Sequence, residues 1–197
     1  MKQTRRGNAL AAWLAEDPLF GPFTKIPAKE GGVDLEGIAV AGMRVAIGMR
    51  GPIMQTYAVL IELPMKVAKS GRLKIGGAIH RRLLDLEGLG IRDLKRHGGD
   101  LLILAGPTTG LDGPCAVYRW RNWLGDPPKH DSVVRLHRPE RIIDLPFGRG
   151  CDHPEGLALL AAAKGDTELL VLCDSPSDVR LDRKRRVLLC DVFALPR

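Results

Sequence analysis

Hydrophobic and polar positions along the chain repeat as a module that occurs three times. Each copy begins with a short apolar segment with charged residues near its start, and a second strand follows that ends in a small residue and a proline before a third strand. The prolines, Pro52, Pro107 and Pro176, are 55 and then 69 residues apart. A period of this length is typical of β-propeller blades rather than of helical repeats.

Apolar patterns inside the modules predict strands of two kinds. Val45, Ile47 and Met49 alternate with other residues, as in a strand with one apolar face. Residues 101–105 are apolar without a break, which predicts a strand covered on both faces. Residues 122–139 combine glycine, adjacent prolines, two histidines and Trp123, and we interpret them as a long exposed loop with poor internal order.

The N-terminal segment predicts a short amphipathic helix packed on a sheet. Leu10, Trp13 and Leu14 lie at helical spacing, Asn8 is suited to the N-cap, and Pro18 follows the apolar run. The run is too short for an export signal. No segment reaches the roughly 18 apolar residues that cross a bilayer, so no membrane association is expected.

These patterns predict an all-β, propeller-like fold of about three four-stranded blades. We expect a helix and a proline-rich connection over residues 1–30, followed by blades over roughly 31–84, 85–150 and 151–197. A closed propeller needs at least about four blades. The expectation is therefore a partial or open ring, completed by a second copy in a homodimer or by a missing N-terminal half of the propeller.

Composition argues against two classes of function. The net charge is +7, but aromatic residues make up only 5% of the chain and the basic residues are spread along it, which argues against nucleic-acid binding. The four cysteines show no C-x-x-C pair of the kind that zinc sites use. Unpaired cysteines indicate a reducing, cytoplasmic location.

The repeated motifs resemble those of a bacterial family of uncharacterised proteins. Its shared domain of unknown function is thought to be a β-propeller, and the resemblance implies that fold but no activity. It also implies that this chain corresponds to the C-terminal half of a longer member. The matching stretches, which include D-L-E-G-I-A, G-M-R-G-P and D-H-P-E-G-L, are residues 26–29, 32–39, 47–52, 85–94, 101–108, 111–114, 152–157, 173–177 and 191–196.

Charged residues recur near the start of the innermost strand of each module. In a propeller these strands line the central channel, so their side chains converge on one axis. Crowded carboxylates need a cation between them, either arginine or a metal ion such as Ca²⁺. We expect Asp34, Glu36, Asp93 and Glu155 as metal ligands, and Asp152, His153, Arg50 and Arg92 as catalytic residues.

Three functions are consistent with this cluster. The first is a metal-assisted hydrolase of lactones or phosphoesters, in which Ca²⁺ polarises a small anionic or ester ligand and His153 or Asp152 activates water. The second is a non-catalytic binding or scaffold domain, anchored on Trp120 and Trp123, whose axial acids pair with arginines or accept backbone hydrogen bonds. The third is an inactive, truncated member of the family.

Overall fold

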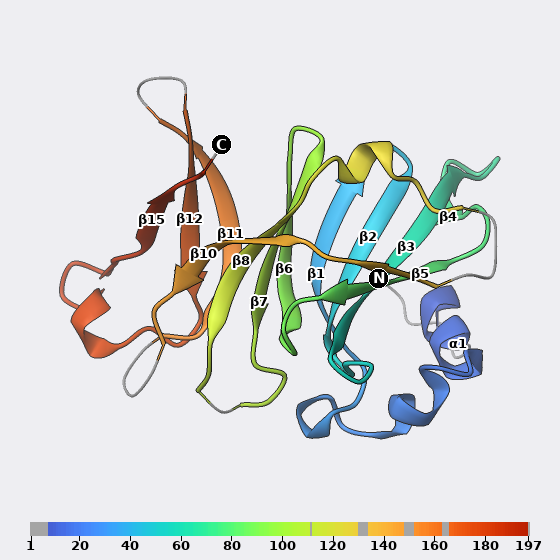
Figure 1. Cartoon of the computed structure of the whole chain (residues 1–197), viewed down its shortest axis with the longest axis horizontal. Helices are drawn as coiled ribbons and strands as arrows, with labels where there is room; N and C mark the ends of the chain where they lie inside the picture. Colours follow the sequence, from blue (N-terminus) through green and yellow to red (C-terminus); the bar gives the residue numbers. More distant parts are fainter. Residues whose placement is uncertain (1–7, 111, 130–133, 148–151, 163–165, 197) are drawn as a thin grey trace.

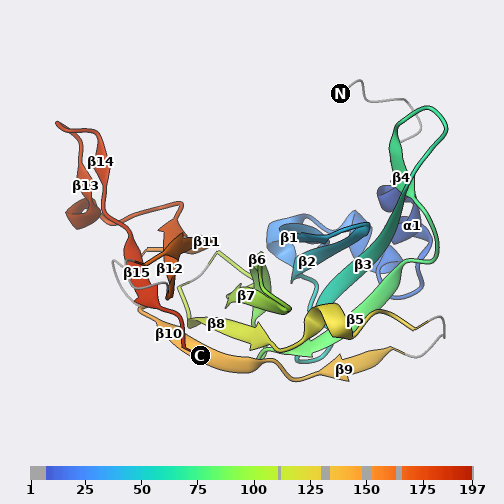
Figure 2. The ribbon, with the colours of Figure 1, turned by 90° about the horizontal axis from the view of Figure 1, so that it is seen from above.

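The computed structural model describes residues 8–110, 112–129, 134–147, 152–162 and 166–196. Most of them lie in β-strands that form three larger sheets and one small hairpin (Figure 1). The sheets fan out from three inner strands and leave one side of the arrangement open (Figure 2). The predicted all-β, open, propeller-like class is confirmed.

The first sheet has six strands rather than the four that were predicted. Its order is β1-β2-β3-β5-β9, and β4 pairs with β3 beside this path. All its pairs are antiparallel except β5 with β9, which are parallel. Strand β9 joins this sheet from a distant part of the chain. The strands are β1 (Asp34–Ala41), β2 (Arg44–Gly51), β3 (Tyr57–Val67), β4 (Leu73–Ile75), β5 (His80–Asp85) and β9 (Arg135–His137).

The second sheet has the predicted four strands, in the order β10-β8-β7-β6. Residues 101–105 lie in its strand β7 and are fully buried, as their unbroken apolar run predicts. This central sheet has a neighbouring sheet on each face (Figure 2). Its strands are β6 (Gly90–His97), β7 (Asp100–Gly106), β8 (Cys115–Trp120) and β10 (Glu140–Leu145).

The third sheet has three strands, in the order β11-β12-β15, and a separate two-stranded hairpin precedes β15. The expected boundary between residues 150 and 151 lies outside the described residues. The elements of this region are β11 (Pro154–Ala161), β12 (Thr167–Cys173), the 3₁₀ turn η4 (Asp178–Arg180), β13 (Leu181–Asp182), β14 (Val187–Leu188) and β15 (Asp191–Ala194).

The predicted N-terminal helix is confirmed as α1 (Ala9–Glu16), followed by the 3₁₀ turns η1 (Gly21–Lys25) and η2 (Ala28–Glu30). Asn8 caps it, since its side-chain oxygen accepts a 2.8 Å hydrogen bond from the N–H of Ala11. Leu14 and Phe20 pack on the first sheet, on the face that carries Met49, Val59 and Ile61. None of the described helices is long and apolar enough to cross a membrane.

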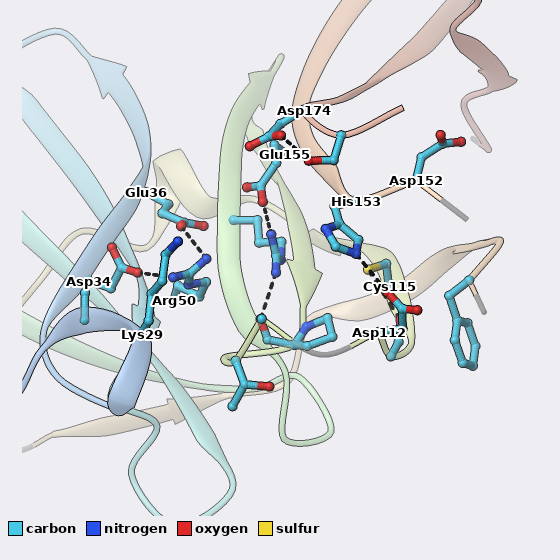
Figure 3. A pocket seen from close by; sticks show the side chains of 18 residues that line it. Lys29, Asp34, Glu36, Arg50, Asp112, Cys115, Asp152, His153, Glu155 and Asp174 are labelled. Atoms are coloured by element: carbon cyan, nitrogen blue, oxygen red, sulfur yellow. Dashed lines mark hydrogen bonds and ion pairs between the residues drawn. The ribbon is translucent and has the colours of Figure 1, made fainter. Parts of the chain in front are cut away.

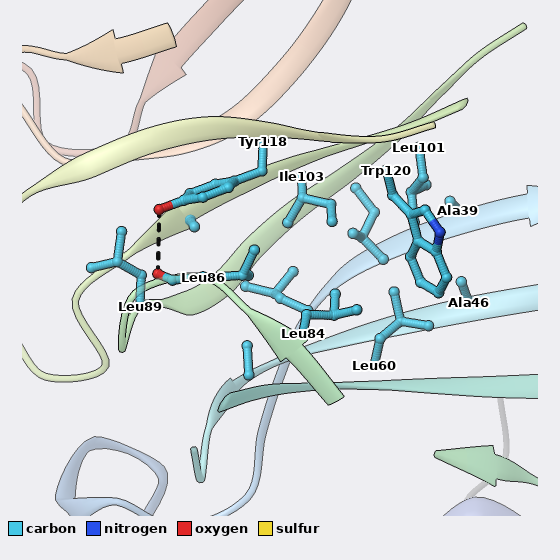
Figure 4. Close-up of a cluster of buried hydrophobic side chains, with 14 of the residues drawn as sticks. Ala39, Ala46, Leu60, Leu84, Leu86, Leu89, Leu101, Ile103, Tyr118 and Trp120 are labelled. Atoms are coloured by element: carbon cyan, nitrogen blue, oxygen red, sulfur yellow. Dashed lines mark hydrogen bonds between the residues drawn. The ribbon is translucent and has the colours of Figure 1, made fainter. Parts of the chain in front are cut away.

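Two hydrophobic cores join the three sheets. The core between the first and second sheets brings Leu60 and Leu84 against Ile103 and Tyr118 (Figure 4). The core between the second and third sheets contains Leu102, Leu104, Val117, Leu157 and Leu169. The inner strand β6 lies between β1 and β11 and contacts both. The contact of β1 with β6 is therefore repeated by the contact of β6 with β11.

The interpretation of residues 122–139 as an exposed loop is wrong for the residues that the structure describes. The 3₁₀ turn η3 (Trp123–Gly125) buries Trp123 completely, and β9 pairs with β5. Trp120 is also buried. Neither tryptophan is on the surface to anchor a partner, because both complete the inside of the fold.

A fully buried carboxylate, Glu62 on β3, holds this segment in place. Its Oε1 accepts a hydrogen bond from the indole N–H of Trp123 and its Oε2 accepts one from Arg82, both at 2.8 Å. The guanidinium of Arg44 lies 3.2 Å from Oε1 and stacks over the Trp123 ring. Arg82 also donates to the carbonyl of Asp126 at 2.8 Å. A single carboxylate thus compensates two arginines and ties η3 to the first sheet.

Replacing Glu62 by glutamine should destabilise the chain strongly. The amide keeps the shape of the side chain but removes the buried counter-charge of Arg82 and leaves it only the half-exposed Asp126, at 3.7 Å, which costs roughly 3 kcal/mol. Urea unfolding followed by circular dichroism measures the loss. Glu140→Gln is the control, because Glu140 pairs with Arg121 on the surface and its loss costs about 0–1 kcal/mol. Equal losses in the two variants would contradict the role of Glu62.

Candidate functional site

Each of the three inner strands carries a β-bulge near its start. The register with the neighbouring strand shifts at Glu36 in β1, at Arg92 in β6 and at Glu155 in β11. A bulge adds one residue to a strand and turns its side chain away from the regular alternation. The three bulged residues occupy equivalent positions in the repeat, and all three are charged.

The bulged side chains meet in one cavity of about 610 Å³ (Figure 3). Seven of the eight predicted site residues line it, and Asp174, which directly follows β12, lines it as well. Other lining residues come from turns, among them Lys29, Asp112 and Pro107. The predicted site residues that line the cavity are Asp34, Glu36, Arg50, Arg92, Asp152, His153 and Glu155.

Arg50 neutralises the acidic residues of the first sheet. Its guanidinium lies 2.6 Å from Asp34 Oδ2 and 3.0 Å from Glu36 Oε1. All three side chains are largely buried. One arginine therefore faces two carboxylates of the same sheet.

Arg92 joins the second sheet to the third. Its guanidinium forms an ion pair with Glu155 and donates a 3.0 Å hydrogen bond to the carbonyl of Pro107. The Arg92 side chain is almost fully buried, and the absence of a side chain at Gly106 leaves room for it. This pair of bulged residues is both part of the cavity wall and a link between sheets.

Asp93 is the predicted site residue that the structure places elsewhere. Its Oδ1 accepts the N–H of Leu94 and its Oδ2 accepts the N–H of Leu157, each at 2.8 Å. Because Asp93 follows the bulged Arg92, it lies on the face of β6 that meets the third sheet. The carboxylate serves the packing of β11 on β6, and it is not among the cavity-lining residues.

Asp152 and His153 line the cavity, but each already has a partner. Asp152 accepts hydrogen bonds from the N–H of Ser177 and from Arg180. Burial alone would raise the pKa of Asp152, but these hydrogen bonds outweigh it and lower the pKa. His153 Nε2 lies 2.8 Å from Asp112 Oδ1, and both side chains are exposed.

Glu36 is the group whose acidity the site changes most. Burial and the nearby charge of Glu155 raise its pKa from 4.5 to about 7, and Arg50 opposes this rise. Its second oxygen, Oε2, is buried and has no hydrogen-bond partner among the described residues. Glu36 can therefore both take up and release a proton near neutral pH.

The residues present do not fit the expected calcium site. The four expected ligands were Asp34, Glu36, Asp93 and Glu155. Two of these carboxylates bind Arg50, one binds Arg92, and Asp93 accepts backbone N–H groups. Ca²⁺ takes six to eight oxygen ligands. Within the described ranges, no group of three or more His, Cys, Asp and Glu side chains is placed to hold a metal ion.

Sequence reasoning missed several residues of the cavity wall. Asp112 and Asp174 were not among the expected site residues, and Lys29 was placed in the proline-rich connection. Asp174 could have been found, because it occupies the position in the third module that Arg50 occupies in the first. Asp112 gave no such signal, since its contact with His153 joins loops 41 residues apart.

The pKa of Glu36 should be near 7 when measured by ¹³C NMR of the side-chain carboxyl groups. Glu155→Gln should lower it, because that variant removes the neighbouring negative charge and frees Arg92. The folded chain then binds more protons than the unfolded chain between pH 4.5 and about 7, so this group makes the free energy of unfolding fall as pH rises through that range. A Glu36 pKa near 4.5 would contradict the described environment, and Glu140→Gln should leave it unchanged.

Comparison with known proteins places the chain in a family without an assigned activity. No curated protein and no solved structure matches it. The model of one family, described as a protein of unknown function (DUF3616), matches residues 1–191. The chain therefore belongs to the DUF3616 family.

Proposed function

We propose that the chain binds a small amine-bearing molecule in the cavity between the bulged inner strands. The observation that carries the proposal is the charge of the cavity wall. Among the described residues, six carboxylates line it against three cationic side chains and one histidine. The carboxylates are Asp34, Glu36, Asp112, Asp152, Glu155 and Asp174, and the cations are Lys29, Arg50 and Arg92.

The arginines of the wall are poorly suited to bind a separate anion. Arg50 already faces two carboxylates, and Arg92 binds Glu155 and a backbone carbonyl. The one nitrogen of each that lacks a partner among the described residues, Nε, is buried. An anionic ligand, as expected from the sequence, would have to displace these partners and would meet the remaining negative charge. We therefore favour a cationic ligand over an anionic one.

Glu36 is the side chain that an ammonium group would contact. Its Oε2 is a buried acceptor without a partner among the described residues, and such groups are rare in folded proteins. A cation beside it would favour the ionised carboxylate and reverse the rise in pKa. Ligand binding and proton release from Glu36 are then coupled, so amine affinity should increase as pH rises through about 7.

Isothermal titration calorimetry with 1,4-diaminobutane, and with inorganic phosphate as the anionic probe, tests the proposal. We expect the diamine to bind and phosphate not to bind, with tighter diamine binding at pH 8 than at pH 6. Glu36→Gln should weaken diamine binding about tenfold, because one charged contact becomes neutral. Glu140→Gln serves as control. Phosphate binding without diamine binding would overturn the proposal.

Ester or lactone hydrolysis without a metal is a second candidate, favoured by the position and acidity of Glu36. In this reaction ionised Glu36 takes a proton from water, and the hydroxide attacks the carbonyl carbon. Because Glu36 becomes neutral when it takes this proton, Arg50 then faces one carboxylate in place of two and stabilises the developing oxyanion. The carbon–oxygen bond then breaks, and the leaving alkoxide takes the proton back from Glu36.

The hydrolytic candidate predicts a distinct pH profile. With γ-butyrolactone as substrate, kcat/KM should rise with pH and level off above about 7, because the ionised form of Glu36 acts as the base. Glu36→Gln should lower kcat/KM by about 100-fold or more. If the hydrolysis rate equals that in buffer alone, amine binding remains the proposed function. If the chain also fails to bind the diamine, the third function expected from the sequence, an inactive member of the family, is favoured.

A further inference from the structure

The two end sheets of the fan expose apolar side chains, and the central sheet does not. No large hydrophobic side chain of β6, β7, β8 or β10 is exposed. On β1, in contrast, Ile38 and Val40 are 58% and 54% exposed. On the third sheet, Leu172 and Val192 are 39% and 49% exposed. Exposed apolar side chains thus lie on β1 and on the third sheet, the two places where a neighbouring sheet would pack.

Residues at the same distance after each bulge face the same neighbouring sheet. The second residue after the bulge faces the preceding sheet: Leu94 in β6 and Leu157 in β11 are both buried there, at 0% and 3% exposure. Ile38 holds the same position after the bulge of β1. It is the one member of this set of three that is exposed.

The first residue after the bulge faces the following sheet. Gly37 lies against Leu94, and a Cβ at Gly37 would come within 2.9 Å of the Leu94 side chain. Asp93, at the same position in β6, accepts the N–H of Leu157. Gly156 holds this position in β11, and the only described side chain near it is Leu172 of its own sheet, at 3.7 Å.

The outer face of the third sheet therefore matches the face of the first sheet that receives β6. Gly156 and Ala158 correspond to Gly37 and Ala39, two small residues that allow an inner strand to approach closely. The register places Leu170 and Val192 beside Ala158 on this face. Such a surface fits an inner strand with an aliphatic residue two places after its bulge.

We propose that this face binds strand β1 of a second copy of the chain, with Ile38 of one copy packed on Gly156 of the other. Both halves of the contact are present on every chain, so two copies can make it twice about a two-fold axis. The six sheets would then close into a ring, within the four to eight blades that propellers contain. The bulged residues of both copies would surround one axis.

Sedimentation velocity and light scattering of the full chain test this proposal over about 1–100 μM. We expect a species of twice the 21.5 kDa chain mass. Ile38→Asp and Gly156→Val should each weaken the dimer about 100-fold, the first by burying a charge and the second by filling the space that Ile38 needs. Ile38 is exposed, and a Cβ at Gly156 would make only an ordinary contact with Leu172, at 3.7 Å, so circular dichroism and thermal unfolding of dilute samples should be unchanged.

A mixture of the two variants separates this arrangement from other dimers. A pair made of one Ile38→Asp chain and one Gly156→Val chain keeps one intact contact, so the mixture should form more dimer than either variant alone. Val179→Asp in η4 is the control, because Val179 is also exposed but belongs to neither sheet. A monomeric wild type at 100 μM, a species larger than a dimer, or a dimer that survives either variant would overturn the proposal.

Discussion

The close approach of β6 to the first sheet is the constraint on which the site depends. A Cβ at Gly48 would overlap the side chain of Ile91, and a Cβ at Gly90 would overlap the carbonyl of Arg50. Strands β2 and β6 come into contact only because Gly48 and Gly90 lack side chains. This contact sets Arg50 of the first sheet beside Arg92 of the second, and thereby brings the charges of two sheets to one cavity.

The convergence of charged residues could be predicted from the sequence, because equivalent positions of a repeat occupy equivalent places around an axis. The direction of each side chain could not. Arg92 and Asp93 are adjacent, yet Arg92 lines the cavity and Asp93 binds the backbone of β11. A bulge shifts the alternation by one residue, and no residue type at Glu36, Arg92 or Glu155 signals it. The sequence therefore left open whether arginine or a metal ion compensates these carboxylates, and the structure pairs three of them with arginines.

The described part of residues 122–139 shows a second limit of prediction from sequence. Their prolines, glycine and histidines indicate an exposed loop, but β9 completes the first sheet and Trp123 is buried. The cause is Glu62, a charged residue within an apolar strand. A carboxylate in that position is costly unless it is paired, and its partners Arg82 and Trp123 lie 20 and 61 residues away. Local composition gives no information about pairs of this kind.

The charges of the site come from three different sheets, so their distances from one another depend on how the sheets are stacked. Arg50 and Glu36 belong to the first sheet, Arg92 to the second and Glu155 to the third. The pKa of Glu36 depends on Glu155, and Glu155 is held by Arg92. A ligand that binds Glu36 therefore favours one relative position of the three inner strands. Any partner that packs on the end sheets restrains the same strands, and the two binding events must then influence each other equally.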